Sequence, residues 1–381
     1  MASPTNHLTL AVAGSGKTRG IVTACASSSD NARILVLTYT VANQRELETR
    51  LAPIMSTHAG LEVSGWFSFL IGHFVRPFLP HLYKSQRVRG FAFDSEAPDW
   101  AKNEDCQRYF SSIDEVRRVH LPQLACRVEA ASSGAGIRRL RRVFDRIYID
   151  EVQDLCGYDL EILKLLMDSG IPLEMVGDVR QAVLATNERE QKNKKYMYLG
   201  IWDWFQEQKK KGRLDIEQQT TTWRCRPEIA AFADSLFAPE RGFDPTQSVN
   251  QRVTSHDGVY LVRSSDIRTY VAQFAPLLMR WDKRSRKDLD DLHPMNYRIA
   301  KGLEAEHALI IPTPKITAFL RNGTPLDDSI ASRFYVAVTR AKQSVAIVLD
   351  DGTGCSLPVW VPENRPDTRA ILPVAASGGS G

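Results

Sequence analysis

The chain contains 381 residues with a formal net charge of +4, of which 43% are hydrophobic and 25% are charged, so two domains with separate cores can form. None of the six cysteines lies in a C-x-x-C pair, which argues against a zinc knuckle or an iron–sulfur cluster. No apolar run reaches transmembrane length, and the first residues lack the basic and apolar regions of a signal peptide, so we expect a cytoplasmic protein with no membrane partner.

A phosphate-binding loop is predicted near the N-terminus. The short apolar segment His7–Ala11 is expected to form a strand, and a helical stretch, Arg19–Ala26, follows the loop. Glycines let backbone N–H groups turn inward to cradle phosphate oxygens, and the helix N-terminus adds partial positive charge. We therefore expect this loop to bind a nucleotide and Mg²⁺. Thr18 would bind the metal, and the phosphates would be contacted by Ala13, Gly14, Ser15, Gly16 and Lys17.

Two adjacent carboxylates follow the next buried strand, Arg146–Ile149. Asp150 is expected to bind Mg²⁺, and Glu151 is expected to orient and deprotonate the attacking water. An acidic turn that caps the helix predicted at Gly157–Ser169 is an alternative reading, and the two roles are compatible. Another apolar strand, Leu173–Gly177, comes next, and this alternation predicts an α/β fold with a parallel sheet and a site at the strands' carboxyl ends.

Six segments, in this order, resemble the motifs of superfamily 1 helicases of the UvrD/Rep type. They are AVAGSGKT (Ala11–Thr18), YIDEVQD (Tyr148–Asp154), VGDVRQ (Val176–Gln181), TTWRCRP (Thr221–Pro227), AKGLEAEH (Ala300–His307) and YVAVTRAK (Tyr335–Lys342). Two more segments, Ile34–Leu51 and Ser64–Leu70, resemble the family's Ia and Ib motifs. The resemblance covers most of residues 8–237 and 295–350.

The resemblance implies two RecA-like P-loop NTPase lobes with parallel sheets and a short inserted subdomain in the first. By position, Gln181 would sense the γ-phosphate, Arg224 would be the motif arginine beside Trp223, and Arg340 would be an arginine finger. Such a finger is worth about 10³–10⁵ in rate in GTPase systems. The resemblance also implies nucleotide contacts by Gln153, Gly302 and Glu304. It implies nucleic-acid contacts by Thr38, Tyr39, Trp66 and Phe67.

Among the basic clusters, we favour Lys194 and Lys195 as phosphate contacts, because they closely follow the VGDVRQ segment. A solvated basic face is the ordinary alternative. The predicted organisation has four parts: a first lobe at 1–81 and 138–208, a short insertion at 82–137, a second lobe at 213–350 and a tail at 351–381.

The chain departs from the family in places that bear on activity. Members of the family usually have an upstream glutamine that reads adenine, and here only Asn6 and His7 lie near that place. The aromatic residues that the family has after the glutamine at position 181 are replaced by other residues in Gln181–Glu190. Trp202 and its neighbours could substitute as stacking groups or could belong to the core of an amphipathic helix. The large insertions of both lobes are mostly missing.

Three functions remain open. The leading one is an ATP- and Mg²⁺-dependent DNA translocase or helicase that acts on single-stranded or tailed duplex DNA, with 3′→5′ movement implied by the resemblance. The alternative is an ATP-gated, nucleic-acid-sensing module that regulates a protein partner such as a nuclease and unwinds little by itself. A P-loop ATPase or kinase unrelated to nucleic acid is the third, and the downstream motifs at Arg224, Gly302 and Arg340 argue against it.

Overall fold

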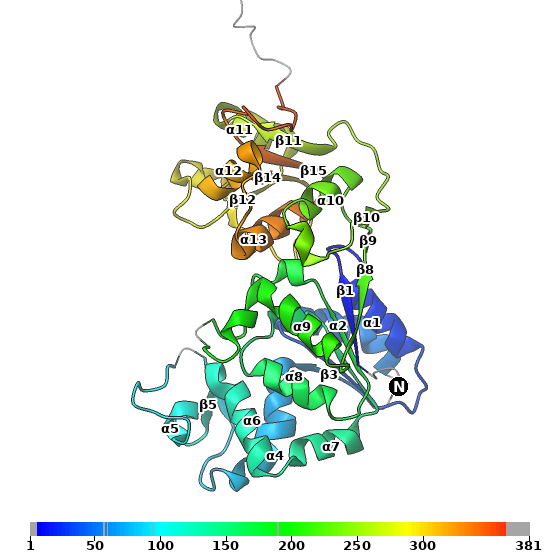
Figure 1. Cartoon of the computed structure of the whole chain (residues 1–381), viewed down its shortest axis with the longest axis vertical. Coiled ribbons are helices and arrows are strands. Elements are labelled where there is room, and N and C mark those ends of the chain that lie inside the picture. The colour runs from blue at the N-terminus through cyan, green and yellow to red at the C-terminus, as the bar shows by residue number, and fades with distance from the viewer. Residues whose placement is uncertain (1–5, 56–57, 59, 94, 189, 363–381) are drawn as a thin grey trace, which may run out of the picture.

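The computed structural model describes residues 6–55, 58, 60–93, 95–188 and 190–362. Two lobes, each built around a sheet with helices packed against it, lie one above the other (Figure 1). The blue-to-green N-terminal part of the chain builds the lower lobe, and the C-terminal part, from green α10 (Pro227–Asp234) to red, builds the upper one.

The first sheet is parallel throughout and has the strand order β3-β2-β6-β7-β1-β8. Its strands are β1 (Asn6–Ala11), β2 (Ile34–Thr38), β3 (Leu61–Gly65), β6 (Arg146–Ile149), β7 (Leu173–Gly177) and β8 (Asp215–Gln219). Strand β8 pairs with β1, so the chain returns to the first sheet within the range expected for the second lobe.

Both faces of this sheet are covered, as its near-continuous apolar strands require. Alternate residues of a strand point to opposite faces. In β2, Leu35 and Leu37 join the core with the helices at 121–131, 159–167 and 201–210, whereas Ile34 and Val36 pack with buried residues of the helices at 17–26 and 41–55.

The second sheet is also parallel, with the order β11-β15-β14-β12-β13. Its strands are β11 (Gly258–Val262), β12 (Leu277–Arg280), β13 (Met295–Asn296), β14 (Ala305–Ile310) and β15 (Ala341–Val348). Two separate apolar clusters cover its faces, one with the helices at 227–234, 314–322 and 328–338 and one with the helix at 267–274. The sequence predicts strands at 258–262, 308–312 and 344–349 in this lobe; β11 has the predicted bounds, whereas β14 and β15 both begin three residues earlier than predicted.

Helices connect the strands of both lobes. The first lobe and its insertion hold α1 (Lys17–Ala26), α2 (Val41–Met55), α3 (Trp66–Phe69), α4 (Arg76–Phe78), α5 (Cys106–Tyr109), α6 (Leu121–Ala131), α7 (Ala135–Val143), α8 (Asp159–Met167) and α9 (Ile201–Lys210). A π-helical segment, Leu70–Val75, joins α3 to α4. The second lobe holds α10 (Pro227–Asp234), α11 (Ile267–Phe274), α12 (Pro314–Asn322) and α13 (Asp328–Val338).

Short paired strands and a docked tail complete the fold. The insertion carries a parallel pair, β4 (Gly90–Ala92) and β5 (Glu115–Arg117), and a second pair, β9 (Thr221–Thr222) and β10 (Gln247–Ser248), lies after β8. In the predicted tail, Trp360 packs on Tyr270 of α11 with 5.0 Å between ring centroids, and residues 363–381 lie outside the described part.

The predicted fold class is confirmed: the molecule is α/β, with two RecA-like lobes built on parallel sheets and a short insertion in the first lobe. Helix α6 lies inside the predicted insertion, yet Leu124 and Val128 join the core of the first lobe. Within the described ranges, none of the helices has both the length and the hydropathy of a transmembrane segment.

Candidate nucleotide site between the lobes

The phosphate loop lies at the carboxyl end of β1 and leads into α1. Gly14 and Gly16 adopt φ of +75° and +82°, a region that favours glycine. A Cβ built on Gly14 would lie 2.4 Å from the Cβ of Arg224, so a larger residue would push the second lobe away from the loop. The Ser15 hydroxyl is buried and has no hydrogen-bond partner among the described residues. A phosphate oxygen fits this loop, because it would accept the hydrogen bond that Ser15 lacks.

The two carboxylates that follow β6 lie beside this loop. The Thr18 hydroxyl donates to Asp150 Oδ2 at 3.1 Å, and the backbone N–H of Glu151 donates to Asp150 Oδ1 at 2.9 Å. A hydroxyl and a carboxylate at this spacing are oxygen ligands of the kind that Mg²⁺ prefers alongside phosphate. The sequence-predicted metal residues are therefore brought together, and the residues present fit the ion.

Electrostatics separate the two neighbouring carboxyl groups. Burial and the charge of Glu151 raise the pKa of Asp150, and the Lys17 ammonium partly opposes them. Burial also acts to raise the pKa of Glu151, but the ammonium groups of Lys301 and Lys17 outweigh it and lower that pKa. Glu151 is thus held as a carboxylate, which is the form that a general base requires.

Lys301 is a site residue that the sequence analysis missed. It lies in the turn between β13 and β14 of the second lobe, and its Nζ is 2.8 Å from both oxygens of Asp154. The same ammonium is 3.3 Å from Glu151 Oε2. Its position directly before Gly302 in the AKGLEAEH segment was the available signal. The turn needs Gly302 at φ +90°, and a Cβ built on this glycine would have no described atom within 4 Å beyond its chain neighbours.

Three polar residues link the carboxylates to the turn after β7. The Gln153 amide donates to Glu151, and its carbonyl oxygen accepts from the backbone N–H of Asp178 at 3.1 Å. Asp178 Oδ2 then accepts from Gln181 Nε2 at 2.9 Å. Asp178 is the second residue that sequence analysis did not assign, although it ends an apolar strand as Asp150 does.

Arg340 reaches the first lobe from the junction between α13 and β15. Its guanidinium donates to Gln181 Oε1 at 3.0 Å and to the carbonyls of Val336 and Leu303 at 2.9 and 3.3 Å. The side chain is buried, with 1% of its surface exposed, and these partners are all neutral. Burial and the nearby Arg224 charge lower the pKa of Arg340. An anion beside this guanidinium would give it a charged hydrogen-bond partner in place of neutral ones.

Arg224 and Glu304 form an ion pair at the rim of the site. Arg224 Nε donates to Glu304 Oε1 at 2.9 Å, and Lys342 Nζ lies 3.2 Å from the other carboxylate oxygen. The backbone N–H of Trp223 donates to the Gly14 carbonyl at 3.0 Å, while 70% of the residue is exposed. These residues line a cavity of about 390 Å³ that opens beside the phosphate loop.

The backbone of the loop at Ala13 is held by two side chains from later in the sequence. The Ala13 carbonyl accepts from the Thr222 hydroxyl at 2.7 Å, and the Ala13 N–H donates to the Tyr335 hydroxyl at 3.4 Å. Arg340, Lys301 and Glu304 all precede strands of the second sheet, so its amino edge faces the carboxyl edge of the first. The candidate nucleotide residues of both lobes therefore meet at one place.

The residues expected to contact nucleic acid are only partly available. Thr38 and Trp66 are each 1% exposed, and the Trp66 indole donates to Asp159 at 2.6 Å. Both side chains are enclosed in the first lobe, and their assignment to nucleic-acid contacts stays a prediction. Tyr39 and Phe67 are half-buried, and their rings contact each other at 5.9 Å.

The remaining candidates lie elsewhere on the first lobe. Lys194 and Lys195 begin a 3₁₀ turn, and Lys195 Nζ lies 4.4 Å from the Tyr196 ring centroid and 3.7 Å from Glu207. Trp202 is buried in the core of α9, which favours the core interpretation over the stacking one. Asn6, near the place of the missing adenine reader, donates to the carbonyls of Met167 and Arg213 at the amino end of β1.

The fold and the loop geometry define a nucleotide-binding P-loop protein. In agreement, residues 1–187 match the model of the AAA domain family. None of the curated proteins matches the chain. Two solved structures of the arterivirus helicase nonstructural protein 10, one of them in complex with DNA, are similar to it, each with 14% identity and a TM-score of 0.45. Each alignment includes 91% of this chain but only 60% or 61% of the helicase chain, so this chain spans about three fifths of each.

Proposed function

We propose that this protein is an ATP-dependent motor of the UvrD/Rep type that moves along single-stranded DNA. The observation that carries the proposal is the contact between Arg340 of the second lobe and Gln181 of the first, at 3.0 Å. An arginine from one lobe that ends beside a polar residue of the other suits an ATPase whose hydrolysis depends on how the lobes are arranged.

The nucleotide would lie between the lobes. Its phosphates would be held by the backbone of Gly14–Gly16 and by Lys17, and Thr18 and Asp150 would hold Mg²⁺. Magnesium bound there neutralises charge on the phosphates during transfer. The exposed Trp223 ring beside the loop offers a stacking surface for the nucleobase.

Glu151 would accept a proton from the attacking water, and Gln153 would hold its carboxylate in place through the hydrogen bond between them. Arg340 would stabilise charge that develops on the transferred phosphoryl group, with Gln181 beside it. Because the guanidinium is buried among neutral partners, it can interact strongly with that charge. Release of the products would remove the anion that draws the lobes together, and the lobes would grip the strand alternately.

The preference for DNA and the 3′→5′ direction rest on the resemblance of the motifs. The alternative, an ATP-gated module that senses nucleic acid and regulates a partner, would use the same site. The two differ in what the lobes do to a duplex, because a motor displaces a strand ahead of it whereas a gated module holds DNA without unwinding it.

Steady-state ATP hydrolysis with and without single-stranded DNA tests the proposal, with Lys17→Ala as the blank. We expect strong stimulation by DNA and, on a tailed duplex, strand displacement that requires ATP. Stimulation without displacement favours the gated module. Hydrolysis that depends on Lys17 but ignores nucleic acid would contradict both.

A further inference from the structure

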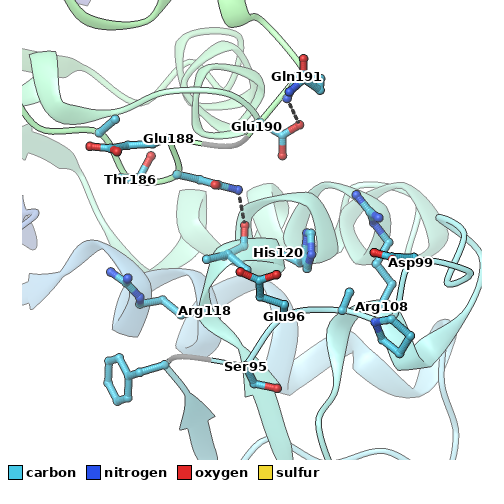
Figure 2. Close-up of a pocket in the computed structure, with 16 residues that line it drawn as sticks. Ser95, Glu96, Asp99, Arg108, Arg118, His120, Thr186, Glu188, Glu190 and Gln191 are labelled. Atoms are coloured by element: carbon cyan, nitrogen blue, oxygen red, sulfur yellow. Dashed lines mark hydrogen bonds between the residues drawn. The ribbon is translucent and has the colours of Figure 1, made fainter.

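A second cavity, of about 740 Å³, lies away from the nucleotide site, between the insertion and the segment that follows Gln181. Figure 2 shows its two walls: Ser95, Glu96 and Arg118 on the side of the insertion, and Thr186 and Glu188 on the opposite side. The volume is within the range of about 300–1,000 Å³ that is typical of ligand sites. The Asn187 side-chain amide donates to the Val119 carbonyl at 3.0 Å and joins the walls.

Arg118 and the Phe93 ring form one end of this cavity, and the Phe67 ring, which does not line it, packs near the same arginine. The Arg118 guanidinium carbon lies 5.6 Å from the Phe67 ring centroid and 5.9 Å from that of Phe93. Phe93 also packs on Phe91 at 5.4 Å, yet 60% of Phe93 remains exposed. Arg118 Nε is buried and has no hydrogen-bond partner among the described residues. An exposed ring beside a guanidinium that lines the same cavity suits a flat ligand that can stack.

The charges of the cavity indicate which part of a nucleic acid would enter it. Four acidic side chains, Glu96, Asp99, Glu188 and Glu190, outnumber the two arginines of the walls, Arg108 and Arg118, although Glu188 is paired with Arg298 at 2.6 Å. Carboxylates repel phosphate, so the sugar–phosphate backbone would stay outside. The same oxygens accept hydrogen bonds from the amino groups of bases, while Phe93 and the Arg118 plane offer stacking surfaces.

The cavity is also tied to the candidate nucleotide site. The backbone N–H of Thr186 donates to the Asp154 carbonyl at 3.2 Å, and its hydroxyl accepts from the backbone N–H of Cys156 at 3.2 Å. Lys301 binds the side chain of the same Asp154. One wall of the cavity is therefore fixed to the chain segment that carries the candidate catalytic carboxylates.

We propose that this cavity is a base-binding subsite for single-stranded nucleic acid, in which an unstacked base lies against Phe93 and Arg118. The proposal rests on the proposed function and adds to it a contact made by this chain's own insertion. The subsite would supply the stacking that the segment Gln181–Glu190 lacks, since that segment has no aromatic residue. Phe67, at the carboxyl end of β3, would connect the subsite to the first lobe.

Phe93→Leu tests the stacking, because leucine keeps an apolar side chain but has no aromatic face. Its affinity for a labelled oligodeoxycytidylate is measured by fluorescence anisotropy at several salt concentrations. We expect a loss of about 5- to 100-fold at every salt concentration. The slope of log affinity against log salt should stay unchanged, because no phosphate contact is removed.

Two further variants control the experiment. Phe93→Tyr keeps the ring and should bind as the wild type does. Trp100→Leu removes another exposed aromatic side chain of the insertion, 64% exposed, that does not line the cavity, and it should leave the affinity unchanged. The same measurement with an oligoribonucleotide of matching sequence identifies whether DNA or RNA uses the subsite. A loss of affinity in Phe93→Leu for either nucleic acid supports the subsite.

Wild-type affinity in Phe93→Leu for both nucleic acids would overturn the subsite and leave the proposed function intact. An equal loss in Trp100→Leu would also overturn it, because the effect would then not belong to the cavity. If the wild-type protein bound neither nucleic acid, the subsite and the proposed function would both fail.

Discussion

Two buried cations of the second lobe meet the first lobe in different ways. Lys301 lies within 3.3 Å of the carboxylates of Glu151 and Asp154, whereas the hydrogen bonds of Arg340 end on neutral oxygens. Direct contact with carboxylates compensates the buried charge of Lys301, whereas Arg340 interacts with the Glu151 and Asp178 carboxylates without a direct hydrogen bond to either. At the scale of single residues, Lys301 therefore suits holding the carboxylates in place, and Arg340 suits receiving an anion.

Glu151→Gln should abolish turnover while nucleotide binding is kept, because it removes the proposed base and leaves the phosphate loop intact. General-base catalysis typically contributes about 10²–10⁴-fold, so the loss in the rate of ATP hydrolysis should be of this order. Binding of a fluorescent ATP analogue provides the comparison, and Lys17→Ala should lose both. Full turnover in Glu151→Gln would refute the assignment of the base.

Lys301→Met should shift the acid limb of the pH–rate profile for ATP hydrolysis. The Lys301 ammonium lowers the pKa of Glu151, so its removal raises that pKa. The carboxylate form is lost as the pH falls through the pKa, and the acid limb should therefore move to higher pH. Lys301→Arg, which keeps the charge, should restore the wild-type profile.

The exposed Lys315, in the same lobe but outside the site, provides a matched control as Lys315→Met. Removing Lys301 also leaves Asp154 buried without its partner, a change that typically costs about 3–5 kcal/mol, so folding is checked by circular dichroism. A folded Lys301→Met protein with an unchanged acid limb would contradict the proposed role of Lys301.

At the scale of elements, α13 carries the second lobe onto the phosphate loop. Its Tyr335 hydroxyl donates to Asp178 Oδ2 at 3.1 Å and accepts from the Ala13 N–H at 3.4 Å, and the residue is 2% exposed. Helix α13 also contacts the 3₁₀ turn Val179–Gln181, which holds the candidate γ-phosphate sensor. Movement of this helix would consequently displace both the phosphate loop and the turn that holds Gln181.

Tyr335→Phe should destabilise the protein by about 1–3 kcal/mol, since it leaves buried polar groups of Asp178 and Ala13 without this partner. The measurement is the free energy of unfolding in urea. Tyr260→Phe is the control, because its hydroxyl donates only to the nearby Asp257 carbonyl within the second lobe. Equal unfolding free energies for Tyr335→Phe and the wild type would show that this contact between the lobes contributes little.

Local patterns in the sequence predicted most of the elements. Strands β6, β7 and β11 have the predicted bounds, because each is a short apolar run that ends at a polar or glycine-containing segment. Strand β8 was missed, since DIEQQ is polar and half exposed as an edge strand that pairs only with β1. The π-helical segment Leu70–Val75 has no signature that separates it from an ordinary helix.

The candidate site was predicted as far as its motifs extend. The positions of Lys17, Thr18 and Asp150 follow from local sequence, because a strand, a loop and a helix place them together. The roles of Lys301 and Asp178 depend on contacts between distant segments, which no local pattern encodes. Burial of Trp66 was equally unpredictable, since an aromatic residue after a strand suits both a core and a stacking surface.

At the scale of the whole molecule, the two lobes share one polar interface instead of packing as independent domains. Pairs that cross it include Lys301–Asp154, Arg340–Gln181 and Arg298–Glu188, the last at 2.6 Å. Polar contacts exchange with water at lower cost than apolar ones, which suits lobes that separate and close again. We expect nucleotide bound at this interface to stabilise the arrangement in which the two lobes are in contact.

Single-turnover ATP hydrolysis by Arg340→Ala, measured with saturating single-stranded DNA, tests most directly whether the two lobes form one catalytic site. We expect the rate to fall by about 10³–10⁵ relative to the wild type, while binding of ATP and DNA is largely kept. An Arg340→Ala protein that hydrolyses ATP at the wild-type rate would contradict the account, because the first lobe would then be catalytically complete without the second.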